Sequence, residues 1–149
     1  MSWRFEGEQP ANEWAGGLHP RSLASTATVL RVYLLGPPVV QWADQPLGIP
    51  RRQTRALLYR LAADLEPIPR AHLCFLFWPD ISESRARRNL TRQLTHLRRA
   101  LPDPEVLITS DDQIMLGRDR VWSDTVAFEE LCVVAVDSRS FGDSGSRVN

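Results

Sequence analysis

Residues 81–101, ISESRARRNLTRQLTHLRRAL, run without proline or glycine and stop directly before Pro102. At about 100° per residue, the apolar side chains of this stretch recur every three or four positions and fall on one side of a helix. The apolar positions are Ala86, Leu90, Leu94, Leu97 and Leu101. The pattern predicts one amphipathic helix, roughly 30 Å long at about 1.5 Å per residue, with the leucine side in the core.

The opposite side of this helix is basic. Between Ser84 and Ala100 the sequence has six arginines and no acidic residue. Neighbouring like charges destabilise an isolated helix by some tenths of a kcal/mol per pair, whereas burial contributes about 1.5–3 kcal/mol per leucine. Because the arginines do not stabilise the helix, we interpret their side as a binding face. Its candidate residues are Arg85, Arg88, Asn89, Arg92, Thr95, His96 and Arg99.

Short elements are expected before this helix. Aliphatic runs bounded by glycine, proline and aspartate predict three antiparallel strands in residues 28–49, the last at 47–49. Pro50 suits the start of a helix over residues 51–65, and Ala56 is expected on its buried side. A second, mostly buried helix is expected over residues 70–78. Just before the long helix, the order DISE matches a capping box in which Asp80 replaces Ser or Thr.

Further short elements are expected after the long helix. Aliphatic runs on either side of a polar turn predict a β-hairpin within residues 106–116. Residues 121–122 predict another short strand that follows this hairpin, and residues 125–131 predict the start of a last helix. The order of a short helix, a tight turn, a long basic helix and a hairpin is typical of a winged helix-turn-helix.

This order of elements suggests how the basic face works. The second helix of such a motif can lie in the roughly 12 Å wide major groove of B-DNA. Arginine pairs bidentately with guanine, asparagine with adenine, and a threonine methyl contacts thymine. We expect the hairpin to act as a wing that reaches the adjacent minor groove or the backbone.

The charge of the chain is asymmetric although its total is zero. The 149 residues include 18 arginines and 18 acidic residues and no lysine. Residues 51–100 hold eleven arginines against four acids, whereas residues 101–149 hold four against ten. Local charge of this kind steers a charged partner. The apolar fraction of 43% is typical of a soluble globular domain.

Several other functions are not expected. No apolar run reaches the roughly 18 residues of a membrane span, and the amino terminus lacks a signal-peptide core. With two cysteines, the chain is expected in the cytoplasm, associated with the nucleoid, without a membrane partner. His72 and Cys74 are interpreted as core packing because no acid orients the histidine. Without zinc spacing or a phosphate loop, we expect no enzyme, no metal and no cofactor.

Four segments form a more specific combination: residues 30–36 (LRVYLLG), 50–58 (PRRQTRALL), 75–80 (FLFWPD) and 85–101 (RARRNLTRQLTHLRRAL). Together they resemble the winged-helix DNA-binding domain of OmpR/PhoB-type response regulators. More closely, they resemble the amino-terminal domain of the Streptomyces antibiotic regulatory protein (SARP) family of bacterial transcriptional activators. The resemblance covers residues 30–131, about two thirds of the chain.

The resemblance implies an α+β fold, a winged helix-turn-helix with an N-terminal antiparallel sheet, three helices and a C-terminal β-hairpin wing. It implies binding to double-stranded promoter DNA at direct repeats and contact with RNA polymerase, and we expect self-association on DNA. By position, the recognition helix of the family maps onto residues 85–101. Arg51 and Arg52, at the entry to the first helix, are expected to contact DNA phosphates.

The domain organisation follows from the same segments. Residues 1–27 are expected to be a flexible leader, residues 28–124 the DNA-binding domain, and residues 125–149 a remnant of a following helical domain with a disordered tail. Most of the helical activation domain of the family is lacking, so the chain is either a minimal or a truncated DNA-binding protein. The alternative to DNA binding is a protein-interaction or decoy module that retains the winged-helix fold.

Overall fold

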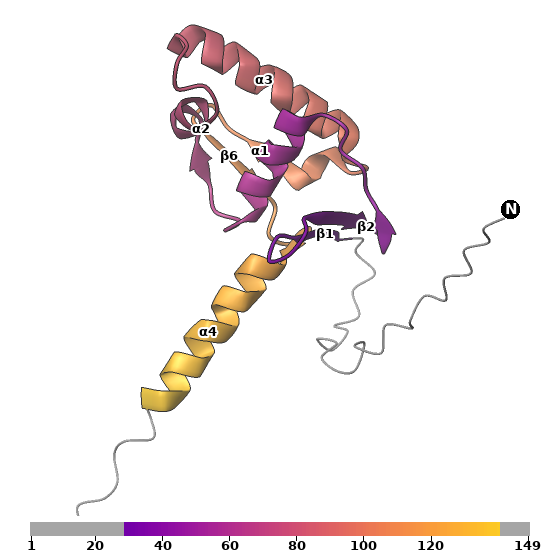
Figure 1. The fold of residues 1–149 in the computed structure, drawn as a ribbon, viewed down its shortest axis with the longest axis vertical. Helices are drawn as coiled ribbons and strands as arrows, with labels where there is room; N and C mark the ends of the chain where they lie inside the picture. Colours follow the sequence, from indigo (N-terminus) through magenta and orange to yellow (C-terminus); the bar gives the residue numbers. More distant parts are fainter. Residues whose placement is uncertain (1–28, 141–149) are drawn as a thin grey trace, which may run out of the picture.

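The computed structural model describes the backbone of residues 29–140 and the side chains as far as Val136. The predicted leader and the end of the predicted tail lie outside the described residues. A four-stranded sheet, a helical layer and a three-stranded sheet form the domain, and a last helix extends away from it (Figure 1). The predicted α+β winged-helix fold is therefore confirmed.

The first sheet begins with two antiparallel strand pairs. β1 (Leu30–Tyr33) pairs with β2 (Val39–Trp42), which pairs with β3 (Gln45–Pro46). The prediction of the third strand at residues 47–49 was wrong. Ala43 and Asp44 adopt positive φ angles of 50° and 60°, as the centre of a tight hairpin turn requires. The chain therefore reverses after two residues, and β3 starts at Gln45.

The fourth strand of this sheet comes from the other end of the domain. β7 (Val121–Ser123) pairs in parallel with β1, Leu30 opposite Val121, and does not extend the hairpin that precedes it in sequence. The backbone NH of Leu30 donates to the carbonyl of Arg120 at 2.9 Å. The N-terminal sheet is thus mixed rather than purely antiparallel, because it takes up the strand that leaves the winged-helix core.

Three helices form the layer that holds the long basic helix. α1 (Arg52–Ala62), α2 (Arg70–Phe77) and α3 (Glu83–Ala100) are packed together, with α3 against both others. The predicted core stripe of α3 is confirmed. Its buried side chains are Ala86, Leu90, Leu94 and Leu97, followed by Leu101 just after the helix. One side of α3 is therefore held in the core along its whole length.

The start of α3 differs from the predicted capping box. Ser82 is the N-cap residue, and its side chain makes no capping hydrogen bond. Glu83 does not reach back over the helix start, because its carboxylate pairs with the guanidinium of Arg87 at 2.6 Å. Glu83 thus forms an ion pair with the residue four positions later in α3 and does not form the predicted capping hydrogen bond.

The buried side chains of the first two helices differ in part from the predicted ones. Leu57, Leu58 and Leu61 of α1 are buried, but Ala56 is exposed, because two residues at about 100° each place it opposite the buried Thr54. α2 was expected to be mostly buried, yet it buries two side chains, Leu73 and Cys74. Only one side of so short a helix meets α3, so its other apolar side chains face outward.

The second sheet contains the hairpin that follows α3. β5 (Leu107–Thr109) and β6 (Gln113–Leu116) form it as predicted, after one 3-10 turn (Pro104–Val106). A two-residue strand that was not predicted, β4 (Ile68–Pro69), pairs with β6 on the other side. The hairpin is thereby attached to the entry of α2, so its position relative to the helices is set.

The last helix is longer than predicted. α4 (Asp124–Ser140) continues well past residue 131 and points away from the domain (Figure 1). The carboxylate of Asp124 accepts from the backbone NH of Leu34 at 2.7 Å and of Leu35 at 3.1 Å, which anchors the start of α4 to the end of β1. No helix within residues 29–140 has the length and hydropathy needed to cross a membrane.

The leucine side of α3 gives a stability test. Leu90 is 1% exposed, so Leu90→Ala should lower the free energy of unfolding by about 2–5 kcal/mol through lost burial and a cavity. Urea unfolding followed by circular dichroism measures the change. Thr91→Ala, at the exposed neighbouring position, should change stability by no more than about 0.5 kcal/mol. Equal effects at both positions would show that α3 does not pack as described.

Candidate nucleic-acid interface

The predicted binding residues lie together on the outer side of α3. Burial of the leucine stripe fixes the rotation of the helix, and every predicted position then faces away from the core. Asn89 and His96 are half-buried and the other five side chains are exposed. The five exposed residues are Arg85, Arg88, Arg92, Thr95 and Arg99.

Hydrogen bonds to neighbouring elements bound this outer face on both flanks. Toward α1, Gln93 accepts from the hydroxyl of Thr54 at 2.7 Å and donates to Gln53 at 3.2 Å. Toward the hairpin, Arg98 donates to the hydroxyl of Thr109. These contacts hold α3 between α1 and β5, so its outer face is presented on a rigid support.

The arginines of α3 fall into two groups by their partners. Arg87 forms an ion pair with Glu83, and Arg98 uses a hydroxyl of the hairpin. Among the residues whose side chains are described, no carboxylate lies within 4.0 Å of the remaining four, Arg85, Arg88, Arg92 and Arg99. The outer face therefore keeps its positive charge and is open to an external anion.

Two side chains of the outer face are ordered by bonds within α3. A guanidinium NH of Arg92 donates to Oδ1 of Asn89 at 3.0 Å, and the hydroxyl of Thr95 donates to the carbonyl of Thr91 at 3.0 Å. The amide NH₂ of Asn89 and the methyl group of Thr95 remain as the groups for an outside contact. The sequence predicted these residues but not the bonds that orient them.

A hollow lies beside the first half of the outer face. It has a volume of about 430 Å³ and is lined by Arg85, Arg88, Asn89 and Arg92 together with Trp78 and Ile81. The last two side chains belong to the turn between α2 and α3 and were not predicted as part of the site. In the sequence, these two apolar residues stand a few positions before Arg85 and Arg88. That closeness to the arginines is the signal by which they could have been included in the site.

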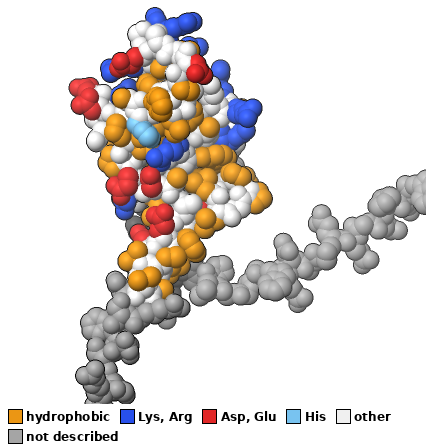
Figure 2. All heavy atoms as spheres, turned by 60° about the vertical axis from the view of Figure 1, so that its left-hand side comes forward, with side chains coloured by type: hydrophobic (Ala, Val, Ile, Leu, Met, Phe, Trp, Pro, Cys, Tyr) orange, Lys and Arg blue, Asp and Glu red, His pale blue; other side chains and the backbone are white. Residues whose placement is uncertain are grey.

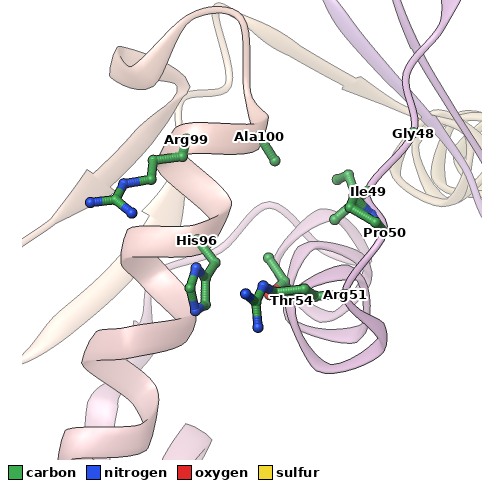
Figure 3. A pocket seen from close by; sticks show the side chains of 8 residues that line it. All are labelled: Gly48, Ile49, Pro50, Arg51, Thr54, His96, Arg99 and Ala100. Carbon is green, nitrogen blue, oxygen red and sulfur yellow. The ribbon is translucent and has the colours of Figure 1, made fainter.

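A second hollow lies between the last turns of α3 and the start of α1. Its volume is about 270 Å³, and Arg51, Thr54, His96 and Arg99 are among the residues that line it (Figure 3). The structure thus brings Arg51 to the end of the α3 face. Arg52 is exposed on the first turn of α1 but does not line this hollow.

The potential at this end of α3 is positive. The pKa of His96 lies below its ordinary value, first because the ring is partly desolvated and second because Arg51, Arg99 and Arg92 disfavour its charged form. These groups belong to α3 and to the entry of α1, so the positive region extends from one helix to the other.

The hairpin has the opposite charge. Residues 107–116 contain no arginine, and the turn between β5 and β6 carries the exposed Asp111 and Asp112. Figure 2 shows arginine side chains gathered over the upper part of the domain and apolar side chains along the helix below it. Attraction of a polyanion would therefore come from α3 and the start of α1, and the turn of the wing would not add to it.

His72 and Cys74, which lie two residues apart on α2, differ in burial. Cys74 is buried as core packing predicts, but His72 is exposed on α2, so its interpretation as core was wrong. Burial raises the pKa of the Cys74 thiol, which is opposite to the activation of a thiolate nucleophile. No group of three His, Cys, Asp or Glu residues in the described part could hold a metal ion.

Comparison with known proteins bears on the fold. No protein-family model matches the chain, and no curated protein sequence matches it. The chain is similar to the solved structure of Mycobacterium tuberculosis EmbR in complex with a low-affinity phosphopeptide, with a TM-score of 0.51 and 24% identity. The match covers 63% of this chain and 27% of the EmbR chain. This likeness supports the α+β winged-helix fold that the sequence predicted.

Proposed function

We propose that the chain is a bacterial transcriptional regulator that binds specific sites in double-stranded DNA with the outer face of α3. The observation that carries the proposal is the set of four α3 arginines without a described carboxylate partner, on a helix whose other side is held in the core. Guanidinium groups without ion-pair partners, spaced along one side of a rigid helix, can bind the successive phosphates and bases of an extended polyanion. The fold likeness supports the same assignment.

The dimensions of the face suit the major groove. Fourteen residue steps separate Arg85 from Arg99, or about 21 Å at about 1.5 Å per residue. This length corresponds to roughly six base-pair steps at about 3.4 Å each. A helix about 10–12 Å across fits a groove about 12 Å wide. The face is therefore long enough to meet several base edges and the phosphates on both sides of the groove.

Roles follow from the chemistry of each side chain. In this proposal Arg85, Arg88 and Arg92 pair with guanine edges, and Asn89 pairs with adenine through the amide that Arg92 orients. The methyl group of Thr95 contacts a thymine methyl. The phosphate contacts come from the end of α3 and the entry of α1, through His96, Arg99, Arg51 and Arg52.

The wider setting of this function is proposed from the sequence resemblance. It comprises promoter direct repeats as the DNA target, self-association on that DNA, contact with RNA polymerase as an activator, and association with the nucleoid in the cytoplasm. The EmbR chain that shares the fold is much longer than the matched part, so these activities of a whole regulator go beyond the described domain.

A second candidate function is a protein-interaction module without DNA binding. Exposed apolar side chains support it: Phe75 of α2 is 73% exposed and Leu131 of α4 is 69% exposed. Surface of this kind marks protein contacts when it is contiguous. The two candidates differ in their response to duplex DNA, because only the first requires the outer face to bind a duplex.

Substitution of the central arginines tests the recognition helix. Once a site has been selected from random duplexes, Arg88→Ala or Arg92→Ala should weaken its binding by about 1–3 kcal/mol and relax the preference at one base position. Electrophoretic mobility shifts measure both effects. Arg87→Ala is the matched control, since Arg87 is paired with Glu83 on the flank of α3, and it should bind nearly as wild type. Unchanged affinity of both variants would exclude α3 as the reader.

The salt dependence of binding tests how many arginines meet the duplex. If Arg51, Arg52 and Arg99 each displace a counterion from a phosphate, log affinity against log salt should have a slope of about −3, at about 0.9 per contact. A slope of about −5 to −6 would show that Arg85, Arg88 and Arg92 meet phosphates as well. Fluorescence anisotropy with a labelled duplex measures the slope. Arg52→Ala should reduce its magnitude by about one. Absence of binding to every duplex at low salt would favour the protein-interaction module.

A further inference from the structure

The hollow between α1 and α3 brings two basic side chains face to face. Arg51, at the entry of α1, and His96, in the last turns of α3, extend toward the same space from opposite sides (Figure 3). Arg99 lies at the rim, and its guanidinium points away from Arg51, to the other side of α3 (Figure 3). The two helices thus present Arg51 and His96 to a hollow of about 270 Å³, with Arg99 at its rim.

No acidic group of the described residues compensates this arrangement. No carboxylate lies within 4.0 Å of Arg51, His96 or Arg99 in that part of the chain. Like charges held together raise the free energy of the site. The pKa of His96 is lowered first by desolvation of the ring and second by these neighbouring arginines. The arrangement is favourable only when an anion enters from outside.

The backbone at the same place also favours an anion. Arg51 is the N-cap residue of α1, in an extended conformation (φ −80°, ψ 119°), and it makes no side-chain capping bond. The first amides of a helix have no intrahelical acceptor and carry partial positive charge. An anion in the hollow would therefore meet the start of an uncapped eleven-residue helix as well as the side chains of Arg51 and His96.

We propose that this hollow holds one backbone phosphate of the bound duplex between Arg51 and His96, with Arg99 at the rim, and that His96 takes up a proton from solvent as the phosphate enters. The inference rests on the proposed function, since it assigns a phosphate of the bound duplex to this end of the interface. In this proposal His96 does not contact a base. It becomes positively charged when the duplex binds, and it then contacts the phosphate.

The direction of the pH effect follows from linkage. The groups that face His96 are Arg51 from the entry of α1 and Arg92 and Arg99 on α3, and all three stay charged. Desolvation of the ring and then these arginines hold the pKa of His96 below its ordinary value in the free protein, and a phosphate beside the ring would raise it. Between these two values binding takes up a proton, so affinity increases as pH falls, by at most about tenfold per pH unit.

The test compares binding of the selected duplex at pH 7.5 and 5.5 at one ionic strength. Wild type should bind about three- to tenfold more tightly at the lower pH. His96→Gln should remove this difference, whereas His72→Gln, which changes an exposed histidine on α2, should keep it. The NMR signal of the His96 ring should show its pKa raised by the duplex. If His96→Gln keeps the full pH dependence, the inference fails while DNA binding stands.

A second arm identifies the phosphate. Single phosphates of the duplex are replaced by neutral methylphosphonates, and one position should weaken wild-type binding about tenfold but leave Arg51→Ala binding almost unchanged. Inorganic phosphate alone should shift the His96 signal far less than the duplex does. An equal shift with inorganic phosphate would overturn the inference in favour of a small-anion site. If wild type binds no duplex at all, the proposed function fails together with it.

Discussion

Burial of the leucine side of α3 is the interaction on which the rest of the structure depends. With Leu90, Leu94 and Leu97 almost inaccessible to solvent, the helix has one rotation about its axis that keeps them in the core. The side chains on the opposite side must then face outward. The same burial outweighs the repulsion among neighbouring arginines, because each leucine contributes more than one like-charge pair costs. Charge can therefore gather on the outer face without loss of the helix.

The carboxylates of the domain are placed so that they leave this face open. Asp103 and Glu105 pair with Arg120 at 2.6 and 3.2 Å, and Glu66 pairs with Arg118. Backbone and side-chain bonds lower the pKa of Asp103, so it stays charged and engaged. These pairs stabilise the connections around the hairpin. Opposite charges are thus paired around the hairpin, whereas the outer face of α3 stays basic.

The sequence predicted the elements that local pattern specifies and missed those that depend on distant pairing. The apolar stripe of α3 and the β5–β6 hairpin both depend on residues that are close together in the sequence. The spacing of apolar and polar residues was therefore sufficient to predict them. The partner of β7 could not be inferred, since Leu30 and Val121 pair across ninety residues. A turn was expected over residues 43–46, but its two-residue form was not, because neither Ala43 nor Asp44 is the glycine or asparagine that favours positive φ. The length of α4 was underestimated because its valines favour strands.

For the interface, the sequence indicated which side chains share a face of α3 but not which neighbours meet them. His96 was grouped with the base-reading residues and Arg51 with the phosphate contacts, yet the packing of α1 against α3 places them around one hollow. The packing of the elements around α3 also makes the electrostatic potential differ between its two sides. The hairpin presents Asp111 and Asp112 on one side of α3, and the entry of α1 presents arginine on the other. Because a polyanion is repelled by the first and attracted by the second, a duplex along α3 should lie closer to α1 than to the turn of the wing.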